Sequence, residues 1–249
     1  MKNKNQQKGF GLVEMVVLIG VVVLLVTVGF LGYKAYKKDS QSGSQQSQSE
    51  TKFDSIAITD ESCFTFDRDT QTVVYYSHGG ECPTKVRIPD TISGVEVKKI
   101  GDEAFYDGCL ESDMEGVVIP EGVIEIGKNA FDFCELQFVS LPSSLSLIDD
   151  YAFASNELTY VEIPDQVMSV GISAFNSNRL KTIVIPKSVY IVAKFAFFNN
   201  ELTSVEVQNE AVGIGESAFR ENSLKSVRIS EWADLDDQAF DSDVSIERY

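Results

Sequence analysis

The chain has 249 residues, of which 43% are hydrophobic and 24% are charged, a composition that excludes a wholly disordered or collagen-like protein. Its 38 Asp and Glu residues outnumber 21 Lys and Arg residues, and the resulting net charge of −17 repels nucleic acid phosphates. A single histidine, His78, excludes a two-histidine metal site and leaves one base for a Ser/His or Cys/His pair, so we expect neither an enzyme nor a cofactor.

The N-terminal region differs from the rest of the chain in both charge and hydropathy. Residues 1–53 contain seven lysines and three acidic residues, which makes this region basic on an otherwise acidic chain. Residues 10–33 carry Glu14 as their only charge, and as a helix they would reach about 36 Å, enough to cross a hydrocarbon core of about 30 Å. The sequence therefore predicts a single transmembrane helix over residues 10–38. A buried helix of a soluble domain is the alternative, although such helices rarely lack a polar face for so long.

The string KGFGLVEMVVLIGVV, residues 8–22, resembles the N-terminal segment of type IV prepilins and pseudopilins. In that family a basic leader ends in glycine, cleavage precedes phenylalanine, and glutamate is the fifth residue of the mature chain; the matching residues here are Gly9, Phe10 and Glu14. The resemblance implies a cytoplasmic leader over residues 1–9, a prepilin peptidase and other pilin subunits as partners, and an extracellular location for residues 39–249. An uncleaved signal anchor is the alternative.

Residues 39–53 form the next segment and are almost all Ser, Gln and other small polar residues. Such a segment has too little apolar surface to offset the entropy of ordering it. We therefore predict a disordered linker, which distinguishes this chain from major pilins, whose helix continues into the globular head. A minor or tip pilin, or a pilin-like anchored surface protein, fits the resemblance better.

Residues 54–87 are predicted to form a small β meander that caps the domain that follows. Apolar and polar residues alternate there around two turn-like segments, RDTQ and HGGE. Cys63 and Cys82 bracket this meander, and we expect them to form a disulfide.

The remainder of the chain, residues 88–249, is an internal repeat. Ala-Phe pairs recur, with spacings between the phenylalanines of 26, 22, 22, 22, 22 and 21 residues. The phenylalanines are Phe105, Phe131, Phe153, Phe175, Phe197, Phe219 and Phe240. A second marker, an aliphatic residue before proline, recurs every 22 residues from Ile119 to Ile185. Two markers with one period indicate about seven stacked 22-residue units.

Each unit closes with the pattern Leu-x-x-Val-x-Ile, whose final alternation is typical of a short, half-buried strand. Stacking at a 22-residue offset places these strands in parallel along a solenoid. An asparagine three residues after most of the phenylalanines is expected to bond backbone groups of each coil; these are Asn156, Asn178, Asn200 and Asn222, with Cys134 at the equivalent place in an earlier unit.

The strings IPEGVIEIGKNAFDFCEL and LTYVEIPDQVMSVGISAF resemble the BspA-type leucine-rich repeat. The resemblance covers residues 88–240 and implies a β-rich leucine-rich-repeat solenoid, with a decaying last unit. Known relatives are surface proteins that bind host or neighbouring-cell proteins, so the resemblance implies recognition and no catalysis.

Cys109 and Cys134 occupy near-equivalent places in adjacent coils. Since neighbouring strands lie about 4.8 Å apart, within the Cα separation that a disulfide needs, we predict a second disulfide between them. A zinc site is the alternative, but no CxxC pair occurs and His78 is the only spare ligand. The acidic residues between Asp234 and Asp243 invite a calcium site; they lack the EF-hand spacing, which favours a solvated cap.

The exposed side of the predicted sheet is the candidate binding surface. Residues beside the buried Val or Ile line up across the coils, and an exposed apolar patch among them favours a protein contact. The candidate residues are Val118, Phe138, Tyr160, Glu162, Val184, Glu206 and Arg228. We therefore predict a membrane- or pilus-anchored recognition or adhesion protein that binds an extracellular protein or cell surface. The alternative is a minor pilin or pseudopilin with a structural role in a filament.

Overall fold

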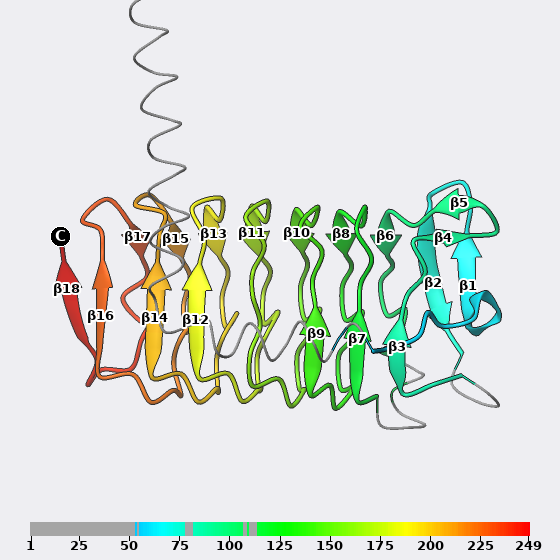
Figure 1. Cartoon of the computed structure of the whole chain (residues 1–249). Coiled ribbons are helices and arrows are strands. Elements are labelled where there is room, and N and C mark those ends of the chain that lie inside the picture. Colours follow the sequence, from blue (N-terminus) through cyan, green and yellow to red (C-terminus); the bar gives the residue numbers. More distant parts are fainter. Residues whose placement is uncertain (1–52, 54, 78–81, 107–108, 110–113) are drawn as a thin grey trace, which may run out of the picture. The chain divides into compact units, whose positions relative to one another are not determined.

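Figure 1 shows a computed structural model, which describes residues 53, 55–77, 82–106, 109 and 114–249. The predicted leader, the predicted transmembrane helix and all of the predicted linker except Phe53 lie outside the described residues, as does His78. Within the described ranges, no helix has the length and apolar character needed to cross a membrane. The residues from Ser55 to Tyr249 form one unit with a continuous core.

The unit is a solenoid with two rows of strands along its length (Figure 1). The first row is a nine-stranded sheet, which in sheet order comprises β1 (Phe64–Asp67), β2 (Thr72–Tyr76), β6 (Lys99–Ile100), β8 (Glu125–Ile126), β10 (Leu147–Ile148), β11 (Ser169–Val170), β13 (Ile191–Val192), β15 (Gly213–Ile214) and β17 (Asp234–Leu235). The second row comprises β3 (Lys85–Arg87), β7 (Gly116–Val118), β9 (Phe138–Ser140), β12 (Thr182–Ile185), β14 (Ser204–Val207), β16 (Ser226–Ile229) and β18 (Ser245–Arg248).

The second row contains the strands that the repeat pattern predicts. These strands form three sheets, β3-β7-β9, β12-β14 and β16-β18. Within each sheet the pairing is parallel and in register, with Thr182 opposite Ser204 and Ile185 opposite Val207. Exposed and buried residues alternate strictly in β12, β14 and β16. The last residue of each strand is the aliphatic residue of the second repeat marker, and it is buried in the core. The repeat pattern does not predict the two-residue strands of the nine-stranded sheet. With these strands included, every full coil supplies a strand to at least one row, and most coils supply a strand to both rows.

The N-terminal end differs in detail from the expected meander. A short 3-10 helix η1 (Glu61–Cys63) leads into β1, which pairs antiparallel with β2, and β2 then pairs parallel with β6. β3 pairs parallel with β7 and so already belongs to the solenoid, while β4 (Thr91–Ile92) and β5 (Val95–Glu96) form a small hairpin.

Both expected disulfides are present in the structure. Cys63 is joined to Cys82 with a Cα separation of 5.8 Å, and Cys109 is joined to Cys134 with a Cα separation of 4.6 Å. The second bond links adjacent coils. Both disulfides lie in the N-terminal half of the solenoid.

A column of phenylalanine rings runs through the centre of the solenoid. From Phe131 to Phe240 the ring centroids of successive coils lie 5.2–5.4 Å apart, with interplanar angles of 3–9°. Tyr76 and Phe105 extend the column at the N-terminal end. The alanine that precedes each phenylalanine is fully buried, because only a methyl group fits beside the ring. This phenylalanine column makes the core continuous from the first coil to the last.

The repeated asparagines form the expected ladder of hydrogen bonds. Asn178 accepts a bond from the backbone N–H of Leu158 at 3.1 Å and donates to the backbone oxygens of Phe153 and Phe175 at 2.9 and 3.2 Å. Asn156, Asn200 and Asn222 repeat this arrangement in their own coils. Each side chain therefore ties its own coil to the preceding coil through buried backbone groups.

Gly171, which directly follows β11, and Gly213 of β15 give a test of how closely the coils approach. A Cβ atom on Gly171 would lie 2.5 Å from the backbone carbon of Asp149, whereas a Cβ atom on Gly213 would meet only the backbone oxygen of Tyr190, at 3.6 Å. We expect Gly171→Ala to lower the free energy of unfolding by about 1–3 kcal/mol, as overpacking does, and Gly213→Ala to change it by less than about 0.5 kcal/mol. Urea titrations followed by circular dichroism measure both, and equal effects would contradict this account of the packing.

Candidate binding surfaces

Three of the seven predicted binding residues lie on the outer side of the second row of strands. Val184 of β12 and Glu206 of β14 are paired in register, and both side chains are exposed. Arg228 of β16 is also exposed, and its guanidinium lies 4.7 Å from the centroid of the Tyr249 ring, within cation–π range. Since β14 also packs against β16, the structure brings these three predicted residues together. We call Val184, Glu206 and Arg228 the front triad.

The prediction that Val118 and Phe138 are exposed is wrong, since each is only 8% exposed. Gly116 is opposite Phe138 in the neighbouring strand, and the ring of Phe138 occupies the space that a side chain on Gly116 would fill. The aromatic ring therefore lies flat against its neighbour and does not project from the sheet. An exposed apolar patch built on Val118 and Phe138 is excluded.

Tyr160 and Glu162 follow in the next coil. Glu162 is exposed, whereas Tyr160 is partly buried. Burial, together with the negative charge of Glu162 and a hydrogen bond to it, raises the pKa of Tyr160 to about 12. The phenol is therefore neutral at physiological pH, and it contributes a hydrogen-bonding group and no charge to this part of the surface.

Exposed apolar residues also occur on the nine-stranded sheet, where no binding site was predicted. Ile124, Met168 and Tyr190 occupy equivalent places in their coils, and Ile191 follows directly. The backbone N–H of Tyr190 donates to the backbone oxygen of Met168, so these two residues lie in adjacent coils. A position-by-position comparison of the units would have revealed this group. Large apolar residues recur at this position, and the equivalent residue in one intervening coil is the polar Ser146.

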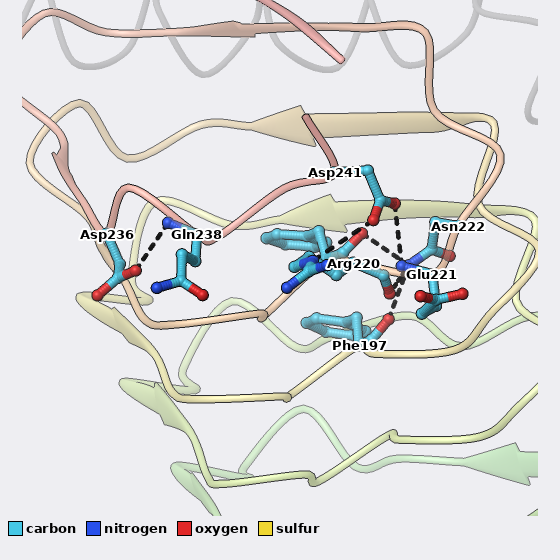
Figure 2. Close-up of polar contacts among 8 residues, drawn as sticks. Phe197, Arg220, Glu221, Asn222, Asp236, Gln238 and Asp241 are labelled. Atoms are coloured by element: carbon cyan, nitrogen blue, oxygen red, sulfur yellow. Dashed lines mark hydrogen bonds and ion pairs between the residues drawn. The ribbon is translucent and has the colours of Figure 1, made fainter. Parts of the chain in front are cut away.

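The last coil encloses a polar cleft of about 670 Å³. Figure 2 shows its main contacts: the Asp241 carboxylate accepts a hydrogen bond from the backbone N–H of Glu221 at 2.9 Å and lies 3.5 Å from Nε of Arg220. The lining residues are Asn200, Arg220, Glu221, Asn222, Ser223, Asp237, Gln238, Phe240, Asp241, Ser242 and Asp243.

Two aspartates at this end replace backbone groups that a further coil would supply. In the preceding coil the N–H of Asn199 donates to the carbonyl of Arg220, whereas the N–H of Glu221 donates to the Asp241 side chain. Asp236 accepts from the N–H of Gln238 at 2.8 Å (Figure 2). These contacts give the acidic stretch a structural role as a cap. Across the described residues, no three His, Cys, Asp or Glu side chains are grouped in a way that would hold a metal ion.

Asp132 is a buried carboxylate near the second disulfide, and it predicts a pH dependence of stability. It is 8% exposed, and its Oδ1 atom has no hydrogen-bond partner among the described residues. Burial raises the pKa of Asp132 to about 6, an effect partly offset by a bond from the Phe133 amide. A raised pKa means that the folded state favours the protonated acid, so this group's contribution to stability declines as the pH rises from about 4 to 6.

We therefore expect Asp132→Asn to stabilise the protein at pH 8 by up to about 2 kcal/mol relative to its effect at pH 4. The measurement is the urea midpoint of the variant and the unmodified chain at both pH values. Comparing the two chains at each pH cancels the titration of the other acidic groups, and a pH-independent difference would contradict the assignment.

Comparisons with known proteins agree with this architecture. A family model described as the BspA type leucine rich repeat region matches residues 98–225 and 168–248, with six copies of the repeat. None of the curated proteins with which the chain was compared matches it.

Two solved structures are similar to this one. A leucine-rich repeat protein of T. pallidum is 24% identical with a TM-score of 0.53, and the match covers 66% of this chain and 89% of that protein. A leucine-rich repeat protein of Bacteroides ovatus is 26% identical with a TM-score of 0.52, and the match covers 71% of this chain. The chain spans about half of the Bacteroides ovatus protein, 49% of its length.

Proposed function

The chain belongs to the BspA-type leucine-rich repeat family, and from this premise we propose that it is an anchored cell-surface protein that recognises another protein or a cell surface. The leucine-rich-repeat solenoid is a binding and structural scaffold that is not typically enzymatic, and members of the family are often found at the cell surface. Recognition, as opposed to catalysis, is the function that this scaffold supports best.

The observation that carries the proposal is the register of the second row of strands. Because β12 and β14 pair without a shift and β16 packs beside β14, outward side chains of successive coils align into columns. The front triad combines an aliphatic side chain, an anion and a cation on neighbouring strands. Such a mixed surface, held on a rigid sheet, suits contact with another protein.

Attachment of protein-coated beads to candidate host or neighbouring cells tests this function. We expect beads carrying the full-length protein to attach saturably, and the combined variant Val184→Ser, Glu206→Gln and Arg228→Gln to lose more than half of that attachment. A matched control makes the same kinds of change at exposed residues outside the triad: Ile172→Ser, Glu210→Gln and Lys187→Gln. Absence of attachment by the unmodified protein would overturn the proposed function, and equal attachment by both variants would exclude the front triad.

The anchor is a separate part of the proposal and rests on the sequence of residues 1–38. The resemblance to prepilins supports cleavage after Gly9 and insertion of the segment that begins at Phe10, with Glu14 available to a neighbouring subunit's amine. N-terminal sequencing of protein from membranes and from sheared surface material tests it. A chain that starts at Phe10 in the sheared fraction would favour a pilus-associated protein, whereas a chain that starts at Met1 and is confined to membranes would favour a plain anchor.

A further inference from the structure

The nine-stranded sheet carries an apolar surface that the core does not use. Met168, Tyr190 and Ile191 are 57%, 60% and 55% exposed. Met168 directly precedes β11, and Tyr190 directly precedes Ile191, the first residue of β13 in the adjacent coil (Figure 1). The front triad lies on the other row of strands, so this surface is separate from the one in the proposed function.

A hollow of about 300 Å³ lies beside this apolar surface. Ile191 of β13, Gly213 of β15 and Asp234 of β17 are aligned in register, and the glycine between two larger side chains leaves the space open. The fold does not require glycine at this position, because a Cβ atom would meet only an ordinary contact at 3.6 Å and the same column holds Leu147 in β10.

The far side of the hollow is acidic. Asp234 and Asp236 both line it and both are exposed. Among the described residues, the Asp234 carboxylate forms no hydrogen bond or ion pair, and the Asp236 carboxylate accepts only the capping bond from Gln238. The same column shows a different arrangement near its other end, where Glu125 pairs with Lys99 of the adjacent coil at 2.6 Å. The acidic side of the hollow is therefore not neutralised within the described solenoid.

We propose that this hollow binds an arginine or lysine side chain of a partner protein, within a segment that has apolar residues on either side. The aliphatic stem of the basic residue lies over Gly213 against Ile191, and its charged end reaches Asp234 and Asp236. The exposed side chains of Tyr190 and Met168 extend the apolar surface for the flanking residues. Charge complementarity selects a basic protein segment, because the acidic side repels nucleic acids and anionic lipid headgroups.

The test measures binding of a fluorescein-labelled heptapeptide of alternating valine and arginine to the full-length protein in detergent, by fluorescence anisotropy. A matched peptide carries citrulline, which is neutral and of similar shape, in place of arginine. We expect the dissociation constant to rise about tenfold in Gly213→Leu, which fills the hollow, and in Asp234→Asn, which removes its unpaired charge. The unmodified chain should bind the citrulline peptide at least as weakly as the two variants bind the arginine peptide.

Two control variants separate this site from general electrostatic attraction and from the front triad. Glu201→Gln removes one exposed negative charge elsewhere, and the combined triad variant alters the other face; both should bind the arginine peptide as the unmodified chain does. Melting temperatures report whether Gly213→Leu folds, and Asp234→Asn tests the site with no change of shape. Failure of the unmodified chain to bind, or equal binding by Gly213→Leu and the unmodified chain, would overturn the inference. Neither result bears on cell attachment through the front triad.

Discussion

Replacing Phe175 with alanine is expected to lower the free energy of unfolding by about 3–5 kcal/mol, the range for removing a fully buried aromatic ring. Phe175 has no exposed surface, and its ring stacks on Phe153 and Phe197 with centroid distances of 5.3 and 5.4 Å. The alanine variant loses both stacking contacts and leaves a cavity in the middle of the phenylalanine column. Because each coil packs mainly on its two neighbours, few other residues can move to fill the cavity, and the full free energy of the lost contacts is removed from the stability.

The same variant is expected to divide the unfolding transition. With the column interrupted at one coil, the blocks on either side retain their own stacked rings, and a urea titration followed by circular dichroism should show a broadened or two-step transition. Phe133→Ala is the control, since that phenylalanine is 55% exposed and lies in another coil of the same solenoid. A single sharp transition with a loss below about 1 kcal/mol would contradict the role given to the column.

Asn178→Ala should have the second largest effect, a loss of about 2–4 kcal/mol. The variant removes the acceptor for the N–H of Leu158 and the donors for the carbonyls of Phe153 and Phe175. The carbonyl of Phe175 keeps its bond from Asn200, whereas the N–H of Leu158 and the carbonyl of Phe153 lose their partner inside the solenoid. Each unsatisfied buried group costs about 1–3 kcal/mol.

Asn176→Ala is the control for this prediction, because Asn176 is only partly buried and its Oδ1 accepts a bond from the neighbouring Ser177 hydroxyl. Its expected effect is below about 1 kcal/mol. Amide hydrogen exchange gives a second readout that denaturation does not. The amide of Leu158 should exchange much faster in Asn178→Ala and at its normal rate in Asn176→Ala, and protection of Leu158 in both would exclude the ladder bond.

The parts of the fold that repeat could be predicted from the sequence. The period, the phenylalanine column, the asparagine ladder and the strands ending at Ile185 and its equivalents all depend on residues that recur in several successive units. The two-residue strands of the nine-stranded sheet could not be predicted, because two residues are too few to show an alternation. Their pairing depends on the close approach of coils at positions such as Gly171, which is a property of the stacked array.

The binding surfaces were harder to predict because they depend on how single units depart from the repeat. Phe138 occupies a position that the repeat pattern predicts to face outward, yet it is buried because its neighbour in the preceding coil is Gly116. Conversely, the hollow at Gly213 exists because one unit has glycine where others have larger residues. Such differences have consequences only between coils, and a reading of each unit by itself does not reveal them.

The placement of the disulfides determines how the molecule responds to tension. The bond between Cys109 and Cys134 links two early coils, whereas the coils from Phe153 onward are held together by noncovalent packing, hydrogen bonds and ion pairs. A load applied between the two ends of the solenoid should therefore peel coils from the C-terminal end one at a time. Each released coil of 22 residues adds about 70 Å of contour length, so the solenoid dissipates force in steps while its oxidised N-terminal end stays folded.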